Sequence, residues 1–471
     1  MKLLFTQDAL VNAGAERSHL EILSRFSKEI EVAFVYFYPK HDLKQEYEKA
    51  GIRLIFLEIP ESYHFRLAVT RLVKTIRKEK PDLLVSSLWR ADIITRIASV
   101  ITGVPLVGTL VNDSYAPIAW KDKRGLKYKM VYWLDRLTAR IPKHWIANAQ
   151  ALAESHEKTL GLDKNKISVV YRGRSIPDNS HLDVIASEAR QSPKGFHDKS
   201  VNQLNSKSVD KDISEKGNRD SESHLEDNEN EERGFGNEGT VENSKNIEME
   251  VKRRDTPSEK YHQNQDSSFN AFHFISYGRL LERKGFQDAI HAFSKVLKKY
   301  PNCTLTIYGE GPYRSDLEIL ITSLGLTDHV KLPGKFGSGG SHSYREENEI
   351  ATPSLRSARN DATTILLEND CFLFPSWYEG FSGALVEAMM AGIPIIASNI
   401  SMNLEAISPK TALIFEFQNR KQLANQMIFA IEHPGLTADL GKAAREEAIA
   451  RFDIEKIAKD YEALLFEIKN N

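Results

Sequence analysis

The chain has 471 residues, which is a prior of about three domains at roughly 100–200 residues per domain. Its 63 Lys and Arg nearly balance 65 Asp and Glu, and the net charge of −2 argues against a protein that wraps a polyanion such as a nucleic acid. Two cysteines, Cys303 and Cys371, are too few for a disulfide framework. Both lie in apolar runs, so we interpret them as buried thiols of a reducing compartment.

The sequence gives no sign of a membrane span or a secretory leader. No stretch approaches about 18 consecutive apolar residues, the length that a spanning helix needs. The first residues, Met1–Asp8, become polar too soon for a signal peptide and are better interpreted as a first strand. We therefore expect a cytoplasmic protein.

Two segments differ sharply in composition from the rest. Residues 177–268 are rich in Ser, Asn, Asp, Glu, Lys and Gly, and a shorter polar segment covers 337–360. A segment of this kind buries too little apolar surface to offset its ordering entropy, so we predict that 177–268 is a disordered insertion or linker. Around these segments we predict domains at 1–176 and 269–453 and an amphipathic helix at 454–471. The sequence does not decide whether that helix packs on the first domain.

In chain order, short apolar runs alternate with longer amphipathic stretches. The predicted strands are 3–6, 31–37, 53–58, 83–87, 106–111, 145–149 and 167–171, then 274–278, 304–309, 330–332, 371–374, 394–398 and 413–417. Predicted helices include 16–26, 66–78, 91–101, 128–140, 287–299, 313–323 and 383–390. This alternation predicts an α/β fold of two doubly wound, parallel-sheet, Rossmann-like domains facing a cleft, with ligands at the carboxyl ends of the strands.

The segment from Cys371 to Pro394 is the most informative. A buried strand leads into a loop with Glu379 and two glycines, and a helix begins near Ser382, a residue type that favours helix N-caps. Free amides at a helix start bind anions, and Glu387 lies roughly 6 Å further along the helix. Two carboxylates flanking a phosphate cradle suit a ligand with hydroxyls on both sides of a diphosphate, such as a nucleotide sugar. The alternative is a plain strand–loop–helix unit with Glu387 on a solvated face.

A second cluster follows the predicted strand at 274–278. Arg279 and Lys284 place two cations at its carboxyl end. Arginine makes bidentate contacts with phosphate oxygens and lysine acts as a mobile point charge, so in a transferase the pair would neutralise charge developing on a leaving diphosphate. The alternative is a solvated basic turn.

Glycine-containing turns add weaker signals. Gly14 after the first strand, and Gly278 and Gly309 on the second rim, allow a ligand to approach the backbone. The backbone at Lys331 and Leu332 could recognise the edge of a base. No G-x-G-x-x-G, P-loop, H-E-x-x-H or paired C-x-x-C is present, which disfavours a nicotinamide or flavin site, and we expect no catalytic metal and no bound cofactor.

Together these segments resemble the family 4 glycosyltransferases (glycosyl transferases group 1), which have the GT-B fold. The matching segments are 13–17, 169–173, 278–285, 308–312 and the family's E-x7-E motif from Glu379 to Glu387. The resemblance implies a retaining, metal-independent hexosyltransferase that moves a sugar from a nucleotide-diphosphate donor to a hydroxyl acceptor. It also implies that the first domain serves the acceptor and the second binds the donor.

The resemblance assigns roles to individual residues. It implies that Arg279 and Lys284 hold the diphosphate and that Glu379 contacts the donor sugar as part of the catalytic set. It implies that Glu387 holds the ribose hydroxyls and that the Gly14 loop lies beside the diphosphate. The donor-binding residues expected on this basis are Gly14, Gly278, Gly309, Lys331, Leu332, Phe381, Ser382, Gly383 and Glu387.

Two positions depart from the family pattern. Many relatives carry a His after the fifth strand, where this chain has Val111, so Asn112 and Asp113 become candidates for contact with the sugar or the acceptor. Arg172 stands where the linker motif has Asn. Val111 and the linker insertion keep open a non-catalytic nucleotide-sugar-binding protein, and a sugar-nucleotide epimerase of the same fold could share the phosphate site. A phosphorylase is disfavoured because the sequence shows no distinctive lysine site for pyridoxal phosphate.

The acceptor side mixes cations with aromatic residues. Residues 120–133 contain both, and 63–80 adds further Arg and Lys. Basic amphipathic helices with Trp and Tyr lie on anionic bilayers, although a charge run is often only a solvated face. The bilayer interpretation predicts peripheral contact with the inner face of a membrane and a glycan or lipid-linked glycan acceptor of the cell envelope. A nucleic-acid partner is least favoured, because the long insertion carries both charges without interleaved aromatic residues.

Overall fold

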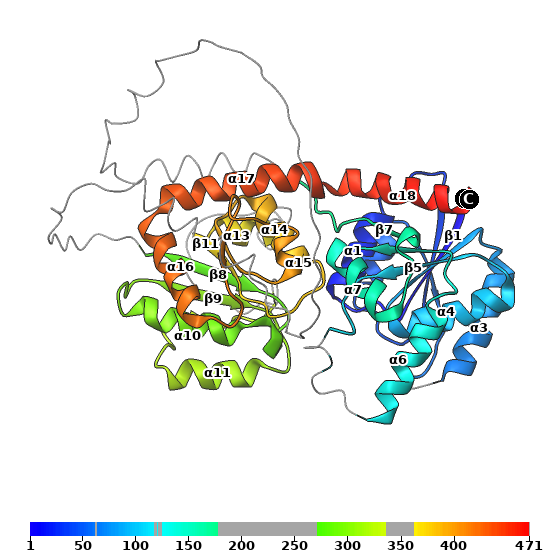
Figure 1. Cartoon of the computed structure of the whole chain (residues 1–471), viewed down its shortest axis with the longest axis horizontal. Helices are drawn as coiled ribbons and strands as arrows, with labels where there is room; N and C mark the ends of the chain where they lie inside the picture. The colour runs from blue at the N-terminus through cyan, green and yellow to red at the C-terminus, as the bar shows by residue number, and fades with distance from the viewer. Residues whose placement is uncertain (62–63, 117–119, 121–124, 178–270, 336–361, 471) are drawn as a thin grey trace, which may run out of the picture. The chain divides into compact units, whose positions relative to one another are not determined.

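The computed structural model describes residues 1–61, 64–116, 120, 125–177, 271–335 and 362–470 (Figure 1). The predicted insertion at 177–268, except for its first residue, and the polar segment at 337–360 lie outside the described residues. So do residues 121–124 of the basic stretch, and of Lys127 only the backbone is described. The predicted α/β class is confirmed, because the described chain forms two parallel sheets with helices between successive strands.

The first sheet has seven parallel strands in the order β3-β2-β1-β4-β5-β6-β7. The order reverses between β1 and β4, the point of a doubly wound sheet where ligands bind. Its strands are β1 Lys2–Gln7, β2 Glu31–Tyr36, β3 Arg53–Phe56, β4 Leu83–Ser87, β5 Leu106–Leu110, β6 His144–Ala147 and β7 Ile167–Val169. Its helices are α1 Gly14–Leu23, α2 Lys44–Lys49, α3 Phe65–Glu79, α4 Trp89–Thr102, α6 Leu126–Thr138 and α7 Gln150–Leu160, with the short η1 Lys164–Lys166.

The second sheet has six parallel strands in the order β10-β9-β8-β11-β12-β13, and its order reverses between β8 and β11. The strands are β8 His273–Tyr277, β9 Thr304–Tyr308, β10 Val330–Lys331, β11 Cys371–Phe374, β12 Ile395–Ser398 and β13 Leu413–Phe415. The helices are η3 Glu282–Lys284, α10 Phe286–Leu297, α11 Arg314–Ser323, α13 Ala362–Leu367, α14 Gly383–Ala391, α15 Ser401–Leu404, α16 Arg420–Glu432, α17 Pro434–Phe452 and α18 Ile454–Asn470.

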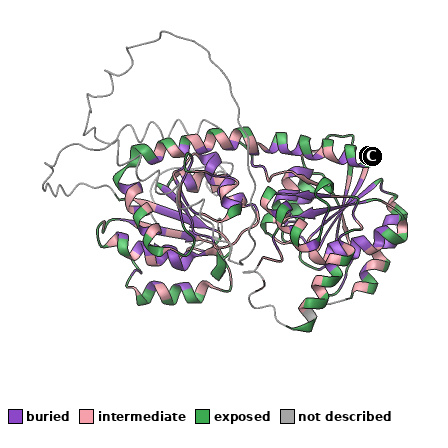
Figure 2. Ribbon diagram, viewed as in Figure 1, coloured by how far each residue is buried: buried purple, intermediate pink, exposed green. Residues whose placement is uncertain are grey.

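The apolar runs form strands because helices cover both faces of each sheet. Every residue of β4, β5, β11 and β12 is buried, and Figure 2 shows purple strands inside both sheets. The helices bury one side against the sheets: α3 buries Ala68, Leu72, Val73 and Ile76, and α10 is mostly buried but exposes Lys295. Cys303 and Cys371 are free and buried, as predicted.

The end of the chain returns to the first sheet. The apolar side of α18, including Ile457, Tyr461 and Leu465, lies in one buried cluster with residues of β1 and α1. Where α17 meets α18, the linker after β7 pairs with the chain: Arg174 N donates to Phe452 O (2.9 Å) and Ile454 N donates to Arg174 O (3.1 Å). The start of the linker after β7 therefore lies beside the junction of α17 and α18.

A search of the described residues for a helix long and apolar enough to cross a bilayer finds none.

Candidate active site

The loops that follow β8 and β11 are joined to each other. β8 and β11 are neighbours in the second sheet, and Trp377 N of the β11 loop donates to Arg283 O of the β8 loop (2.8 Å). Gly285 has a φ of +70°, and a Cβ at this position would lie 2.0 Å from Pro375 O. Glycine is needed here both for the backbone angle and for the close approach. The result is that Lys284 is held beside the loop that carries Glu379.

Lys284 and Glu379 form an ion pair through Nζ and Oε1, with side chains only 17% and 10% exposed. Ser376 Oγ also donates to Glu379 Oε1 (2.7 Å), and Ser398 Oγ in turn donates to Ser376 O (2.5 Å). Both contacts to the carboxylate use Oε1, so neither of them engages Oε2. Glu379 is therefore fixed in direction while one oxygen can still accept a hydrogen bond from a ligand hydroxyl.

Arg279 lies on the same rim but is less constrained. It follows Gly278 directly after β8 and is exposed, and it makes no hydrogen bond or ion pair with another described residue. Of the two predicted cations, the structure thus brings Lys284 to Glu379 and leaves Arg279 open to solvent. Their role toward a diphosphate stays a prediction.

Glu387 projects from α14 into a polar contact network. Tyr277 Oη donates to Glu387 Oε2 (2.7 Å), and Arg174 Nε donates to Glu387 Oε1 (2.6 Å). Arg174 also pairs through Nη1 with Glu21 Oε2 (3.2 Å). Burial by itself would lower the pKa of Arg174, but Glu387 and Glu21 together raise that pKa above its usual value. The second carboxylate of the E-x7-E motif is thus paired with a linker arginine.

Sequence reasoning missed Arg174, although the residue stands next to the linker glycine that the family motif includes. A Cβ placed on Gly383 would lie 1.8 Å from Arg174 Nη2, so the guanidinium rests against the first residue of α14. An arginine one position beyond the linker glycine was the available signal. The sequence could not show that its side chain turns toward Glu387.

The residues before α14 prepare the start of this helix. Phe381 is buried and its ring contacts those of Tyr171 and Phe452, which anchors the loop in the core. Ser382 is extended and precedes the first helical residue, Gly383, but its side chain makes no capping hydrogen bond. The predicted helix start is correct. The Ser382 hydroxyl is therefore not tied to the amides of the first turn.

Three turns on the rim of the second sheet pack backbone against backbone. Gly278 N donates to Tyr308 O (3.0 Å), and Gly309 N donates to Gly334 O (2.8 Å). A Cβ on Gly309, whose φ is +143°, would lie 1.8 Å from Gly278 O. The glycines at 278 and 309 therefore serve the packing of the turns, whatever their contact with a ligand.

The last two predicted donor contacts lie at the end of β10. Lys331 is exposed. The carbonyl of Leu332 accepts a hydrogen bond from Arg314 Nη2 (2.7 Å), so one of its lone pairs is already used. Contact of this backbone with a base stays a prediction.

The loop after β5 meets the loop that carries Glu379. Tyr378 Oη donates to Asp113 O, and a Cβ on Gly380 would lie 2.6 Å from Val111 O. Asn112 is exposed, whereas the Asp113 side chain is buried and accepts from Ser155 Oγ (2.9 Å). The structure thus brings both of these residues near Glu379, but only Asn112 is open to solvent.

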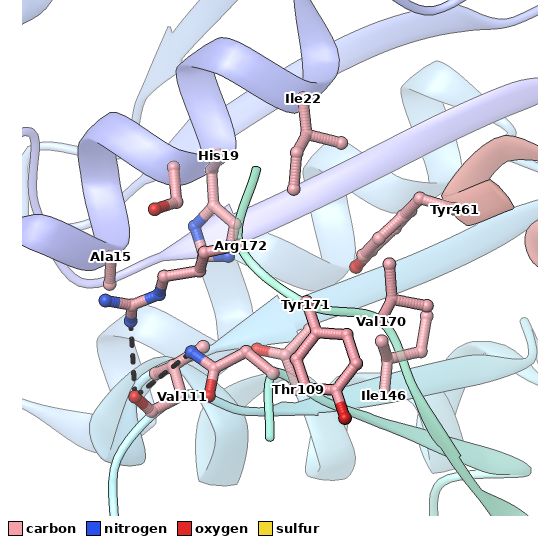
Figure 3. A pocket seen from close by; sticks show the side chains of 12 residues that line it. Ala15, His19, Ile22, Thr109, Val111, Ile146, Val170, Tyr171, Arg172 and Tyr461 are labelled. Carbon is pink, nitrogen blue, oxygen red and sulfur yellow. Dashed lines mark hydrogen bonds between the residues drawn. The ribbon is translucent and has the colours of Figure 1, made fainter. Parts of the chain in front are cut away.

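Arg172 occupies the first-domain side of this region and lines a pocket at the carboxyl ends of β5 and β6 (Figure 3). Its Nη2 donates to Val111 O (3.2 Å), and a Cβ on Gly14 would lie 3.3 Å from its Nη1. With the Asn148 amide oxygen turned toward it, Arg172 makes two further hydrogen bonds, from Nε (2.9 Å) and Nη2 (3.0 Å). The departure from the family's Asn therefore adds a cation beside Gly14 and beside the position of the missing His.

Titratable groups lie buried beneath the Gly14 loop. Burial raises the pKa of Glu16 to about 7, against the opposing effects of Gln7 and Arg172. Burial lowers the pKa of His19 to about 3, and its Nδ1 hydrogen-bonds Gln7 Oε1 (2.8 Å).

Among the described residues no three His, Cys, Asp or Glu side chains are grouped to hold a metal ion, and metal independence stays a prediction.

Two family models match the chain. The description "Glycosyltransferase Family 4" matches residues 12–176, and "Glycosyl transferases group 1" matches residues 271–433. An uncharacterised glycosyltransferase of Methanocaldococcus jannaschii is 27% identical over 227 residues, which are 42% of this chain and 50% of that protein. The N-acetyl-alpha-D-glucosaminyl L-malate synthase of Bacillus anthracis is 25% identical over 186 residues, 39% of this chain and 42% of the synthase. The matched part thus spans half or less of these relatives.

A solved structure extends the likeness to the whole fold. The Anabaena protein HepE, crystallised with UDP, aligns with a TM-score of 0.66 and 19% identity over 99% of this chain and 100% of its own. At that identity the likeness shows the fold alone. The paired sheets and the two family matches lead to one conclusion: the chain belongs to the group 1 and family 4 glycosyltransferases and has the GT-B fold.

Proposed function

We propose that this protein transfers a sugar from a nucleotide-diphosphate sugar to a hydroxyl acceptor, with retention at the anomeric carbon and without a metal ion. The observation that carries the proposal is the Lys284–Glu379 pair, fixed at the carboxyl ends of β8 and β11 with Arg279 beside it. Cations there suit a diphosphate, and a carboxylate with one unengaged oxygen suits a sugar hydroxyl. HepE was also crystallised with UDP-glucose, which makes uridine donors the first to test.

In the proposed reaction the bond between the anomeric carbon and the phosphate oxygen breaks, and the electron pair leaves with the diphosphate. Arg279, Lys284 and the start of α14 stabilise that charge. The acceptor oxygen bonds to the anomeric carbon on the same face, and its proton passes to the departing phosphate. Glu379 orients the donor ring and forms no covalent bond. Exclusion of water during transfer limits donor hydrolysis.

The experiment is product analysis with the full chain. Uridine, guanosine and adenosine diphosphate sugars are incubated with glycan and lipid-linked acceptors in EDTA, and the products are resolved by NMR. We expect transfer to an acceptor with the donor's anomeric configuration kept. Conversion of the donor to an epimer would favour the epimerase alternative, and donor binding without turnover would favour the binding-protein alternative. Either result would overturn the proposal.

The acceptor side includes a helix with an apolar face open to solvent. Along α6 the side chains of Leu126, Met130, Trp133, Leu134 and Leu137 are 42% to 74% exposed. At 100° per residue they lie within an arc of about 100°. Figure 2 shows green, exposed segments along this helix. Soluble proteins rarely leave a row of large apolar residues uncovered unless it binds something.

The charges around this face favour an anionic bilayer as its occupant. Asp135, the one acidic residue in the sequence of α6, is buried and paired with Arg96 (2.5 Å). Lys129 is exposed at the edge of the apolar row, and Arg140, two residues after the end of α6, is also exposed. An apolar face bordered by cations binds anionic membranes through burial of apolar area and through attraction between opposite charges. The proposal therefore includes peripheral membrane contact and a lipid-linked glycan acceptor.

Vesicle sedimentation tests this contact. The full chain should sediment with vesicles containing phosphatidylglycerol and much less with pure phosphatidylcholine, and added salt should weaken the binding. Changing Met130, Trp133 and Leu137 to Ser should abolish it. The matched control changes Ile319 and Leu436, which are exposed apolar residues of the second domain, to Ser. Equal binding by both variants would contradict the proposal. So would a wild-type chain that does not bind vesicles and forms dimers through this face.

A further inference from the structure

Arg174 has a fixed backbone and a buried side chain. Its backbone N and O both pair with the chain around Asp453, where α17 ends and α18 begins. From there the side chain extends toward α14, and its Nη1 donates a hydrogen bond to the carbonyl of the preceding residue, Gly173 (2.8 Å). A guanidinium held this way has little freedom to turn elsewhere.

The positive charge of Arg174 lies at the start of α14, which would be unfavourable for this helix without a compensating negative charge. Nη2 lies against Gly383, the first residue of the nine-residue helix α14. The helix dipole and the free amides of the first turn repel a positive charge there and attract a negative one. Glu387 and Glu21 compensate Arg174, and one of them, Glu387, is the second carboxylate of the E-x7-E motif.

We propose that Arg174 is a positioning residue for the nucleotide donor, an inference that rests on the proposed function. It holds Glu387 through Nε while Tyr277 holds the other oxygen, so the carboxylate keeps one orientation toward the ribose hydroxyls. Its Nη2 adds positive charge at the start of α14, where the diphosphate is expected. The linker between the sheets thereby contributes directly to donor affinity.

A purely structural role makes a different prediction. If Arg174 only joined the linker to its surroundings, its ion pair with Glu21 of α1 would matter as much as its ion pair with Glu387. Glu21 lies on α1 of the first domain, and among the described residues its hydrogen bonds and ion pairs reach α14 only by way of Arg174. Changing Glu21 to Gln therefore separates the two roles.

The test measures UDP affinity by calorimetry for the wild type and for Arg174→Ala, Arg174→Lys, Glu387→Ala and Glu21→Gln. Arg174→Ala should weaken UDP binding about tenfold or more, since a charge-assisted contact to the ligand region is lost. Arg174→Lys should recover part of that loss. Glu21→Gln should stay within about threefold of the wild type. Adding Arg174→Ala to Glu387→Ala should cost less than it does in the wild type, because the two residues act together.

Two results would overturn the inference. One is an Arg174→Ala variant that binds UDP as the wild type does. The other is a Glu21→Gln variant that loses affinity as much as Arg174→Ala does, which would assign the effect to the linker. Thermal unfolding of each variant is measured in parallel, and Arg174→Lys keeps the test valid if the alanine variant unfolds. If the wild type binds none of the uridine, guanosine and adenosine diphosphates and none of the corresponding nucleotide sugars, the proposed function itself is wrong.

Discussion

The two sheets have the same parallel, doubly wound plan, but their carboxyl ends differ in chemistry. At the second sheet both carboxylates of the E-x7-E motif are paired with cations: Glu379 with Lys284, and Glu387 with Arg174. At the first sheet the hydroxyls of Ser87 and Thr109 and the indole N–H of Trp89 are buried without a hydrogen-bond partner among the described residues. The carboxyl edge of the second sheet, the second edge, thus pairs its carboxylates with cations. The carboxyl edge of the first sheet, the first edge, has charged groups such as Arg172 but also leaves neutral polar groups buried without a partner among the described residues.

This contrast fits the proposed division of roles. A diphosphate is recognised by fixed cations, whereas a sugar acceptor offers neutral hydroxyls that can satisfy buried polar groups. Acids near the first edge are also less able to ionise, since burial raises the pKa of Asp92 to about 7, as it does for Glu16. Four sets of substitutions would break or sharpen the contrast.

The largest effect is expected from the ion pair of the second edge. Lys284→Ala and Glu379→Gln should each reduce kcat/KM by about 100-fold or more, because a group that stabilises the transition state is removed. Arg279→Ala should act in the same direction. The control is Lys299→Ala, which removes another Lys–Glu contact of the same domain, with Glu432. If Lys284→Ala and Lys299→Ala show equal transfer rates, the second edge is not the donor site.

The next effect concerns how that edge is assembled. Gly285→Ala should lower the free energy of unfolding by about 3 kcal/mol, since the new methyl group meets Pro375 O and the φ is positive. Urea unfolding measures the loss. Gly325→Ala is the matched control: its φ is +66°, and a Cβ there has nothing within 4 Å. A loss as small as that of Gly325→Ala would show that the two loops are not packed as described.

At the first edge, the stability of the fold should depend on pH. The folded pKa of Glu16 lies above its usual value, so the folded state holds the proton more tightly and is destabilised as pH rises from about 4.5 to about 7. Glu16→Gln should remove up to about 3 kcal/mol of that dependence. The measurement is the urea midpoint of both proteins from pH 5 to pH 8. Parallel pH profiles for wild type and variant would contradict a buried, hard-to-ionise Glu16.

The smallest effect is expected where the first edge meets the loop of Glu379. Asn112→Ala should change kcat/KM by no more than about threefold, since the side chain is exposed and its Oδ1 only accepts from Ser114 Oγ (2.7 Å). Asp113→Ala should cost more, because that carboxylate is buried against Ser155. Kinetics with varied acceptor concentration compare the two. The reverse order would identify Asn112 as a substrate contact.

Much of the second edge could be predicted because it is local in sequence. The run Cys371–Phe374 and the helix start at Gly383 are marked by apolar residues and glycines, and both appear where expected. The E-x7-E motif places Glu379 in the loop before α14 and Glu387 on that helix. The partners of these carboxylates could not be predicted, since Lys284 and Arg174 reach them from 95 and 213 residues away in the chain.

The first edge was largely hidden from the sequence for the same reason. Arg172 stands out only as a departure from the family's Asn, and its contact with Val111 depends on how the linker folds back over β5. The helix Gln150–Leu160 was not predicted, and neither was Arg420–Glu432. The apolar face of α6 resembles a core-facing stripe until the structure shows that nothing in the described chain covers it.

The central claim is that a nucleotide-diphosphate sugar binds at the carboxyl edge of the second sheet. Hydrogen–deuterium exchange of the full chain, in EDTA and with uridine, guanosine and adenosine diphosphate sugars in turn, tests it directly. At least one donor should slow exchange in the segments 278–285 and 379–387, while α11 exchanges unchanged. Protection confined to other segments, or none with any donor, would contradict the account.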